Sequence, residues 1–476
     1  MSINRRRISV AIVSGFFLEL VNKISPLFIL HHAEKTLGLQ NFGLAQYQLA
    51  CLEALQPLVT YGFINYAIQA VSQAQGDGFA SRREVVAHTL LLKAVLATLV
   101  LFTYGFSKFW LTGDYQSFYL LAVVLFATVI DSFWLLIVDH RLAQASLAAG
   151  VLRLINLGLI FFLVNSPSDM LLFVLLSLLP NLLLAIGSGI YAFFRARPRQ
   201  WQFATCRAIL IKSTPFALVT LVSTLFDRLD IFAMRNFFDL TLAGAYAGPQ
   251  KIIQSVALMV GALAAPFYAE VVHLTDKASI YSHVKLSIWV MMVVVAPLVF
   301  GTYFVEQEVL QVVFTNLAGM LPHTLAILAV SMIGSVLLAT FGLQVLLGKG
   351  APWAVFKALL IGLAVTSLIV VLAVSTKVLW LVPFAMVFGK ILSGMMCVFS
   401  ARSYLSALPI AAFVKPCIAG FAMAVALLLL PKLSLLATLL TGGFVYFLTL
   451  YGVSQQEVHE LSQVPKIRRL LIWRRT

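Results

Sequence analysis

Charged side chains lie deep within the apolar stretches of this sequence, and their types suit them to anion binding and ion exchange. An Arg or Lys in a cavity of low dielectric constant can bind phosphate oxygens through charge-assisted hydrogen bonds. A carboxylate in the same surroundings can exchange a proton or a sodium ion. The basic residues are Lys23, Lys93, Arg153, Arg228, Arg235, Lys251, Lys357 and Lys390, and the acidic residues are Glu19, Glu53, Asp131, Asp227, Asp230 and Glu270.

These charges need a partner or water, because one charge at the centre of a bilayer costs from about 2.5 to more than 10 kcal/mol. Lys357 and Glu270 lie about one helical turn from a predicted cytoplasmic end, where a long side chain reaches the interface, so we expect structural roles for both. Six cations lie about 10 or more residues from either end of their span and should face a bundle interior or an aqueous cavity: Lys23, Lys93, Arg153, Arg228, Lys251 and Lys390. A network of structural ion pairs is the alternative explanation for any one of them.

Polar residues also form stripes on three predicted helices. In TLVSTLFDRLDIFAMRNFFDL, taken as one helix with about 100° per residue, Arg228 and Arg235 fall within about 20° of each other. Asp227, Asp230 and the hydroxyl residues Thr220, Ser223 and Thr224 accompany them, with apolar side chains opposite. Two earlier predicted helices carry similar stripes, of Glu19, Asn22, Lys23 and Pro26 and of Gln46, Glu53, Gln56, Pro57 and Thr60. Such helices should line a water-filled space.

The elements that carry these stripes are membrane helices. The chain has 476 residues, of which 61% are hydrophobic and 11% charged, against about 25% charged in soluble proteins. Its mean hydropathy is +0.98. Apolar runs of about 20 residues, the length that spans a bilayer, predict an all-α polytopic membrane protein with about 14 transmembrane helices. The predicted spans are 9–30, 42–72, 84–107, 117–138, 141–164, 169–195, 208–235, 240–271, 280–303, 321–347, 353–375, 379–402, 408–430 and 434–452.

The spans divide into two sets of six and a final pair. We predict a six-helix bundle over residues 1–200, a second over 201–405, an additional helix pair over 406–455 and a basic tail over 456–476. A weak internal repeat agrees, since HHAEKTLGLQNFGLAQYQ after the first span is echoed by RNFFDLTLAGAYAGPQ after the seventh. In that alignment Gly43 and Tyr47 correspond to Gly244 and Tyr246, with a one-residue gap. Parallel repeats of this kind are common in transporters.

Positive charge identifies the cytoplasmic side. One set of alternate loops holds nearly all the Lys and Arg, and the other holds only Lys35, Lys108, Lys377 and Lys432. The positive-inside rule then places both termini in the cytoplasm. The net charge of +15 follows from this topology and from attraction to anionic lipids, so no nucleic-acid partner is expected. The first apolar run contains Glu19 and lacks a cleavage site, which indicates an uncleaved helix.

Soluble-enzyme and metal chemistry find little support. Cys51, Cys206, Cys397 and Cys417 are far apart and form no C-x-x-C pair, so neither a metal site nor a disulfide framework is expected. The longest outer loop, about residues 304–321, is nearly devoid of catalytic His or Asp. We therefore predict no enzyme, although a membrane-embedded glycan polymerase or acyltransferase is the least favoured alternative.

The order and spacing of several motifs resemble the Wzx-type polysaccharide flippases of the multidrug/oligosaccharidyl-lipid/polysaccharide exporter superfamily. The resemblance covers about residues 15–270 and includes TLGLQNFGLAQYQ, YGFINYAIQAVSQ, HTLLLKAVLATLVLF, the segment from DSFWLLIVDHR to VNSPSDM, and DRLDIFAMRNFFDLTLAGAYAGPQKIIQSV. The chain departs from the family in reading WLLIVD where W-F-F-Q-G is common, and in having His31, His32 and Lys35 where an Arg is common.

The resemblance implies two facing six-helix bundles in the inner membrane. They would move an undecaprenyl-pyrophosphate-linked oligosaccharide to the periplasmic leaflet by alternating access, without ATP or another cofactor, and H⁺ or Na⁺ would be the coupling ion if there is one. Membrane lipids, a polysaccharide polymerase and a chain-length regulator are candidate partners, and we expect a monomer. A drug or cation antiporter of the same superfamily and a lipid II flippase are the alternatives.

The predicted site residues follow from these arguments. The expected substrate-binding residues are Lys23, Lys93, Arg153, Arg228, Arg235, Lys251, Gln46, Gln56 and Gln254. Further polar groups available to a glycan are Asn65, Tyr246 and Gln250. The ion-coupling candidates are Glu19, Glu53, Asp131, Asp227 and Asp230.

Overall fold

A computed structural model describes the backbone of residues 5–64, 66–67, 78–107, 115–139, 141–194, 202–314, 321–430 and 434–457. Side chains 5–24 and 78–83, and those of 137, 138, 142, 143, 262, 265, 266 and 269, lie outside the described part. Within these ranges every regular element is helical, which confirms the predicted all-α class. Eleven helices are long and apolar enough to cross a membrane, as expected for a multi-pass membrane protein.

Three of the predicted spans are not among these eleven helices: 9–30, 42–72 and 240–271. The first two belong to α1 (Arg5–Thr60), which is interrupted at Gly38, where φ is 74° and ψ is 161°. Only glycine adopts such a conformation readily, and the break falls between the two predicted spans. The third is α10 (Leu240–Val271), a helix of 32 residues that carries Gln250, Lys251 and Gln254.

The described chain divides into two compact units, Met1–Ala247 and Gly248–Thr476. This division lies C-terminal to the expected boundary at 200/201. The cause is the packing of α8 (Phe203–Phe226) and α9 (Leu229–Ala233), which follow residue 200 but contact α1 of the first unit. The boundary itself falls inside α10.

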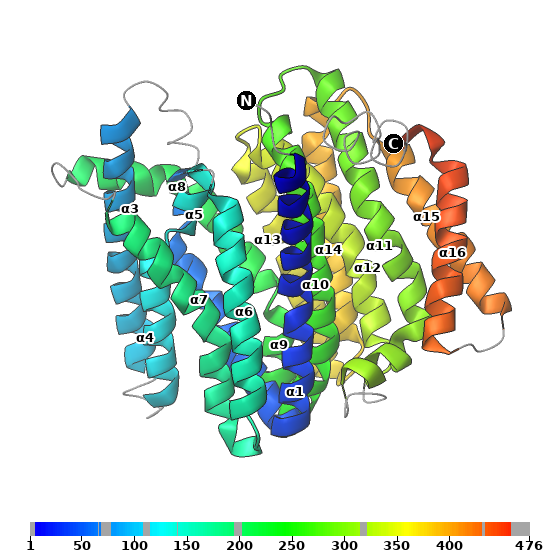
Figure 1. Cartoon of the computed structure of the whole chain (residues 1–476), viewed down its shortest axis with the longest axis horizontal. Helices are drawn as coiled ribbons and strands as arrows, with labels where there is room; N and C mark the ends of the chain where they lie inside the picture. Colours follow the sequence, from blue (N-terminus) through cyan, green and yellow to red (C-terminus); the bar gives the residue numbers. More distant parts are fainter. Residues whose placement is uncertain are drawn as a thin grey trace. The chain divides into compact units, whose positions relative to one another are not determined.

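The first unit is built around α1. This helix contacts α3 (Gly78–Val100), α4 (Tyr115–Ile130), α6 (Leu142–Leu163), α7 (Met170–Phe193) and α8. Figure 1 shows α3 and α4 side by side, and they also contact each other. A short helix, α5 (Phe133–Val138), follows a break at Asp131 and Ser132 in what was predicted as one span.

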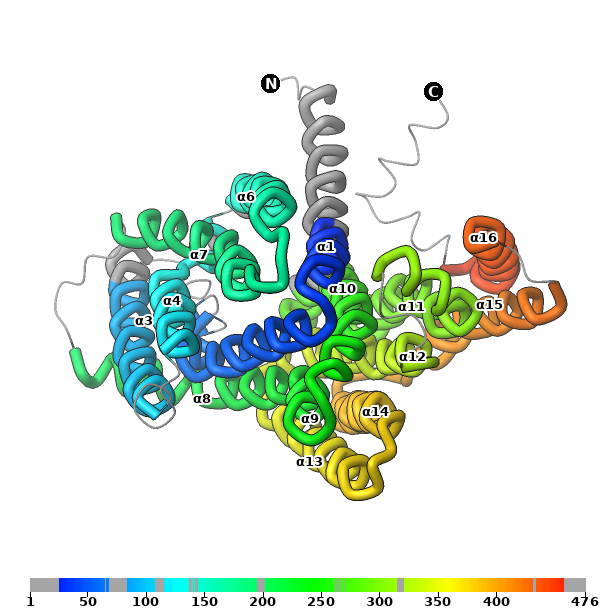
Figure 2. Tube along the Cα trace, turned by 90° about the horizontal axis from the view of Figure 1, so that it is seen from below, coloured from blue at the N-terminus to red at the C-terminus, as the bar shows by residue number. Residues whose placement is uncertain are grey.

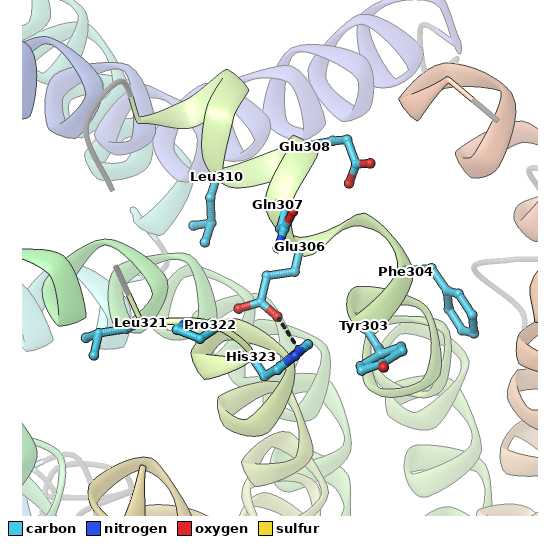
Figure 3. A pocket seen from close by; sticks show the side chains of 9 residues that line it. All are labelled: Tyr303, Phe304, Glu306, Gln307, Glu308, Leu310, Leu321, Pro322 and His323. Carbon is cyan, nitrogen blue, oxygen red and sulfur yellow. Dashed lines mark ion pairs between the residues drawn. The ribbon is translucent and has the colours of Figure 1, made fainter. Parts of the chain in front are cut away.

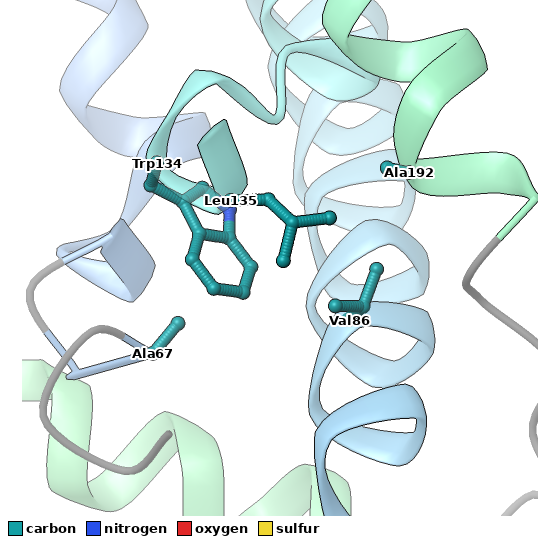
Figure 4. Close-up of a cluster of buried hydrophobic side chains, with 5 residues drawn as sticks. All are labelled: Ala67, Val86, Trp134, Leu135 and Ala192. Carbon is teal, nitrogen blue, oxygen red and sulfur yellow. The ribbon is translucent and has the colours of Figure 1, made fainter. Parts of the chain in front are cut away.

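Close packing fixes α5 against its neighbours. Trp134 and Leu135 of α5 lie in a buried cluster with Ala67, Val86 of α3 and Ala192 of α7 (Figure 4). Trp134 is only 3% exposed, and burying a side chain of this size within a membrane protein gains mainly dispersion contacts. This cluster ties the break in the fourth predicted span to two long helices.

The second unit consists of most of α10 together with α11 (Lys277–Val313), α12 (Thr324–Leu337), α13 (Pro352–Thr376), α14 (Leu381–Ala401), α15 (Ile410–Leu429) and α16 (Leu435–Val453). In Figure 2, α13 lies beside α14 and α15 beside α16, and each pair is in contact. The predicted C-terminal helix pair is thus α15 and α16, and it packs on α11. The predicted tail lies outside the described residues beyond 457.

The N-terminus of α11 has a side-chain cap. The Asp276 carboxylate accepts the backbone N–H of Ser279 at 2.9 Å and so caps α11. That hydrogen bond holds the pKa of Asp276 below its ordinary value.

Beyond α12 the helix continues as ten residues of π-helix, Leu338–Leu347. Small residues permit close helix contact, since a Cβ at Gly362 would lie 2.7 Å from the Gly389 carbonyl oxygen.

Candidate functional site

A polar pocket of about 310 Å³ opens in the first unit between the second half of α1 and α8. Its lining comprises Glu53, Gln56, Pro57 and Thr60 of α1, Thr220 and Thr224 of α8, and Arg228 just beyond α8. All of these residues belong to the two polar stripes that the sequence predicts. The structure therefore brings those stripes together on one pocket.

The pocket is centred on an ion pair. The Arg228 guanidinium contacts the Glu53 carboxylate directly, and the two side chains are 16% and 35% exposed. At an effective dielectric constant of about 20, such a pair is worth about 4 kcal/mol at 4 Å separation before desolvation is subtracted. A guanidinium presents a planar fork of donors that also matches phosphate oxygens. An anionic ligand and Glu53 would therefore compete for the same cation.

Arg228 reaches the pocket because the helix ends just before it. The Asp227 N–H still bonds to the Ser223 carbonyl at 3.0 Å, whereas the Arg228 N–H bonds to the Leu225 carbonyl at 3.2 Å. This shift from an i−4 to an i−3 partner tightens the final turn. Asp227 is the half-buried C-cap residue of α8, and α9 begins at Leu229.

Close contact between α1 and α8 holds the pocket's two walls. At Gly62, where φ is +66°, a Cβ would lie 2.6 Å from the Ala217 nitrogen, so only glycine permits this approach. Beside it, the Tyr61 and Thr214 hydroxyls form a hydrogen bond of 3.2 Å. These contacts hold the end of α1 against α8 and set the spacing across the pocket.

The prediction of one continuous helix over Thr220–Leu240 is wrong. The chain breaks at Asp227 and Arg228, continues as α9, and becomes a π-helix over Met234–Phe238. The angular relation calculated for Arg228 and Arg235 therefore does not apply. Charge and hydroxyl groups near the break compete for backbone hydrogen bonds, which favours a helix end there.

Asp230 and Arg235 of that segment have partners other than Glu53. Asp230 is 1% exposed and accepts a hydrogen bond of 2.9 Å from the Tyr246 hydroxyl, which is itself buried. Arg235 lies over the Tyr47 ring, with the guanidinium carbon 5.4 Å from the ring centroid. The Phe232 ring meets the same tyrosine edge-on at 5.9 Å. These contacts give Asp230 and Arg235 evident packing roles.

Lys93, which is buried, and Asp131, which is half-buried, form a separate group. Lys93 is 2% exposed, and its ammonium donates to the Asp131 carbonyl oxygen at 2.7 Å. The Asp131 carboxylate accepts the Phe133 N–H at 3.0 Å and the Ser188 hydroxyl at 3.2 Å. The group thus joins α3, α7 and the break before α5. Neither residue lines the Arg228 pocket, and both satisfy backbone groups that the break exposes.

The remaining predicted residues are dispersed. Gln46 of α1 is 4% exposed, and its side-chain carbonyl has no hydrogen-bond partner among the described residues. Arg153 is half-buried on α6, and Lys251 and Gln254 are half-buried on α10 in the second unit. The side chains of Glu19 and Lys23 lie outside the described part, as does Asn65.

One polar cluster consists of residues that the sequence does not predict as a site. The predicted outer loop 304–321 is partly helical, because α11 continues to Val313 and carries Glu306. A second pocket, of about 200 Å³, lies between the end of α11 and the start of α12 in the second unit. The motif FVEQEVL at 304–310 directly follows an apolar run and was the available signal.

The fold defines the class of this protein as a multi-pass membrane protein with the architecture of known flippases and exporters. It matches "Lipid II flippase MurJ, inward closed conformation" with a TM-score of 0.73, 11% identity and coverage of 94% of this chain and 99% of that one. It also matches an inward-facing "multidrug resistance MATE family transporter of the MOP superfamily" with a TM-score of 0.56 and 13% identity, over 81% of this chain and 97% of that one.

The family is shown by sequence. Residues 12–271, more than half of the chain, match the model of the polysaccharide biosynthesis protein family, and the chain belongs to that family. It is 21% identical over 242 residues to the "Putative O-antigen transporter" of Shigella dysenteriae. That match covers 49% of this chain and 57% of the relative. The matched relative is named as a transporter, and this chain spans little more than half of its length.

Proposed function

We propose that this protein is a flippase that carries an undecaprenyl-pyrophosphate-linked oligosaccharide across the inner membrane for cell-surface polysaccharide synthesis. The single observation that carries the proposal is the pocket in which Arg228, 16% exposed, is paired with Glu53. Family membership and the names of the relatives support the same class of cargo.

Arg228 would hold the pyrophosphate. This group carries about two negative charges at neutral pH and presents strong acceptor oxygens, so it can displace the single carboxylate of Glu53. The hydroxyls of Thr60, Thr220 and Thr224 line the same pocket and can donate to phosphate or sugar oxygens. Gln56 adds an amide that suits a glycan.

Glu53 would couple binding to an ion. With cargo absent, it neutralises Arg228 inside the protein, where an unpaired cation is costly. When cargo takes Arg228, Glu53 is left without its cation, which favours uptake of a proton or a sodium ion. Release of that ion on the other side would restore the pair and expel the cargo. This exchange of partners would drive alternating access if the inward- and outward-facing states differ in their affinity for the cargo and the ion.

Replacing Arg228 with Gln tests this proposal. In a strain that depends on this protein, Arg228→Gln should reduce surface glycan at least tenfold while the protein stays in the membrane, because loss of a charge-assisted pair removes more than about 1.4 kcal/mol of binding. Arg228→Lys should retain part of the activity, since the charge remains but the planar fork is lost.

The matched control is Lys357→Gln, which removes one cation from an exposed position on α13. It should leave surface glycan unchanged. Normal glycan in the Arg228→Gln strain would contradict the proposed cationic site, and an equal loss in both variants would point to a general effect of charge on membrane insertion.

A lipid II flippase is the second candidate, because its cargo shares the pyrophosphate and the fold matches such a protein over 94% of this chain. Depleting the lipid II flippase of a host cell separates the two cargoes. Rescue of growth by this protein would favour lipid II, whereas restored surface glycan without rescue of growth would favour the oligosaccharide. Sequence coverage by the polysaccharide family leads us to expect the second result.

A further inference from the structure

The second pocket lies at the end of α11 and shares no lining residue with the Arg228 pocket. It is lined by Tyr303, Phe304, Glu306, Gln307, Glu308, Leu310, Leu321, Pro322 and His323. Figure 3 shows the Glu306 carboxylate directed toward His323, with the Tyr303 ring beside the histidine, while Phe304 and Glu308 point away from that carboxylate. All of these residues belong to the second unit.

Glu306 supplies a carboxylate oxygen that lies near His323 but whose hydrogen-bonding capacity is unfilled among the described residues. The residue is only 4% exposed, and its Oε1 accepts the Leu325 N–H at 2.9 Å in the first turn of α12. Its Oε2 has no hydrogen-bond partner among the described residues, and His323 Nδ1 lies 3.8 Å away, beyond hydrogen-bond reach. A buried carboxylate oxygen in that state is costly. A donor entering the pocket would satisfy it.

Tyr303 supplies an apolar surface next to that acceptor. Its ring is stacked on His323, with centroids 5.3 Å apart and planes 16° apart, yet 59% of the residue is exposed. An aromatic face carries negative partial charge and attracts weakly positive C–H groups. The exposed Gln307 adds an amide that both donates and accepts hydrogen bonds.

The backbone is held in an unfavourable conformation to present His323. This residue has a φ of 62° at the N-cap of α12, a left-handed conformation that costs a non-glycine residue about 1–3 kcal/mol. Strain of this kind persists where surrounding contacts impose it, here the Tyr303 stack and the Glu306 contact. The side chains of Tyr303, Glu306 and His323 therefore hold one another in place at this pocket.

The charge and size of the pocket limit its ligand. Glu306 and Glu308 both line it, so an anion such as a phosphate would be repelled. Among the described residues, His, Cys, Asp and Glu form no group of three or more that could hold a metal ion. A volume of about 200 Å³ lies below the usual range for drug-sized ligands, about 300–1,000 Å³. A small, neutral ring with several hydroxyl donors and an apolar face fits these limits.

We propose that this pocket binds a single neutral sugar residue of the transported glycan. One sugar hydroxyl donates to Glu306 Oε2, a second pairs with the Gln307 amide, and the C–H face of the ring packs on Tyr303. The identification of the sugar as cargo rests on the proposed function, but the binding itself does not. The pocket then selects among glycans by the pattern of hydroxyls, while Arg228 recognises the pyrophosphate common to all of them.

Ligand-observed saturation-transfer NMR on the purified full-length protein in nanodiscs tests this binding. The probes are methyl glycosides of glucose, galactose, rhamnose and N-acetylglucosamine, with methyl phosphate as the anionic comparison. At least one glycoside should show saturation transfer at millimolar concentration, and methyl phosphate should show none that depends on this pocket. Gln307→Ala and Tyr303→Ala should each reduce the glycoside signal at least threefold.

One further test variant and one control accompany these measurements. Glu306→Gln should also reduce the signal, and its amide oxygen can still accept the Leu325 N–H, so the start of α12 is retained. Tyr451→Ala removes an equally exposed tyrosine from α16 and should leave the signal unchanged. Absence of saturation transfer from every glycoside, or a signal that persists in the Tyr303→Ala/Gln307→Ala double variant, would overturn the inference.

The outcome is separable from that of the proposed function. Loss of sugar binding in a protein whose export still depends on Arg228 would reject only the sugar pocket. Sugar binding that depends on Tyr303 in a protein whose export is indifferent to Arg228 would reject only the pyrophosphate site.

Discussion

At the scale of single residues, the informative feature is the difference between charges that line a pocket and charges that complete the packing. Arg228 and Glu53 share a pocket with three threonines. Lys93 instead donates to a main-chain carbonyl and is 2% exposed. From the sequence, Lys93 and Arg228 were equally plausible ligands for an anion. Burying a cation is costly whether it binds a ligand or completes the packing, so the cost does not distinguish the two roles.

Exchanging the two charges tests the Arg228 pocket at this scale. Glu53→Arg and Arg228→Glu should each destabilise the protein by about 1–3 kcal/mol, since each leaves like charges together, with the effect reduced by the partial exposure of Glu53. The double variant should regain most of the lost thermal stability in detergent.

The double variant should not regain transport, even though it regains thermal stability. In the double variant the cation lies on α1 instead of beyond α8, so the geometry around a pyrophosphate changes while the net charge does not. Thermal unfolding and surface glycan are measured on the same three variants. Full export by the double variant would mean that only the presence of a cation matters, and would contradict a positioned phosphate site.

At the scale of elements, helix breaks and glycine contacts position the site. At the break after α4, the Asp131 carboxylate accepts the Phe133 N–H, whereas at the break after α8 the N–H groups of Asp227 and Arg228 bond to main-chain carbonyls. The glycines that the repeat aligns, Gly43 and Gly244, lie against each other. A Cβ at Gly43 would approach the Leu240 carbonyl oxygen to 2.3 Å, and one at Gly244 would approach the Leu39 carbonyl oxygen to 2.2 Å.

Bulky residues at these two glycines should separate the helices. Gly43→Val and Gly244→Val should each cost about 1–3 kcal/mol or more, because the obstructing atoms are backbone and cannot rotate away. Thermal stability by fluorescence-detected size-exclusion chromatography measures the effect.

The matched control is Gly158→Ala on α6, where an added Cβ would meet nothing within 4 Å. It should leave stability unchanged or raise it by up to about 1 kcal/mol, since alanine favours helix. Equal stability of the valine variants and this control would show that the start of α10 does not depend on close contact with α1.

At the scale of the whole molecule, the distribution of Lys and Arg predicts how the chain crosses the membrane. The connection between α13 and α14 carries Lys377, one of the few cations on the predicted periplasmic side, whereas that between α14 and α15 carries Arg402. The termini are predicted to be cytoplasmic.

Reporter fusions measure this topology. Alkaline phosphatase, which is active only in the periplasm, should be active when joined after Lys377 and inactive when joined after Arg402. Green fluorescent protein joined to the C-terminus should fluoresce. Phosphatase activity at both positions would be incompatible with a helix between them that crosses the membrane, and the reverse pattern would invert the predicted orientation.

The sequence by itself determined the all-α class, eleven of the predicted spans and the residues that line the Arg228 pocket. Hydrophobic length and period depend only on local composition, so the spans and the faces bearing Glu53, Gln56 and Thr220 could be derived without knowledge of their neighbours. The sequence also contained the family, through the order of its motifs.

Tertiary structure alone decided which polar groups meet. Asp230 and Arg235 seemed to continue the Arg228 stripe, but the break at Asp227 sends them to Tyr246 and Tyr47. The packing of α11 and α12 brings Glu306 close to His323, which lies 17 residues later in the sequence. Helical periodicity reports direction only within an unbroken helix, and it carries no information on what lies opposite, so pairing between elements could not be predicted from it.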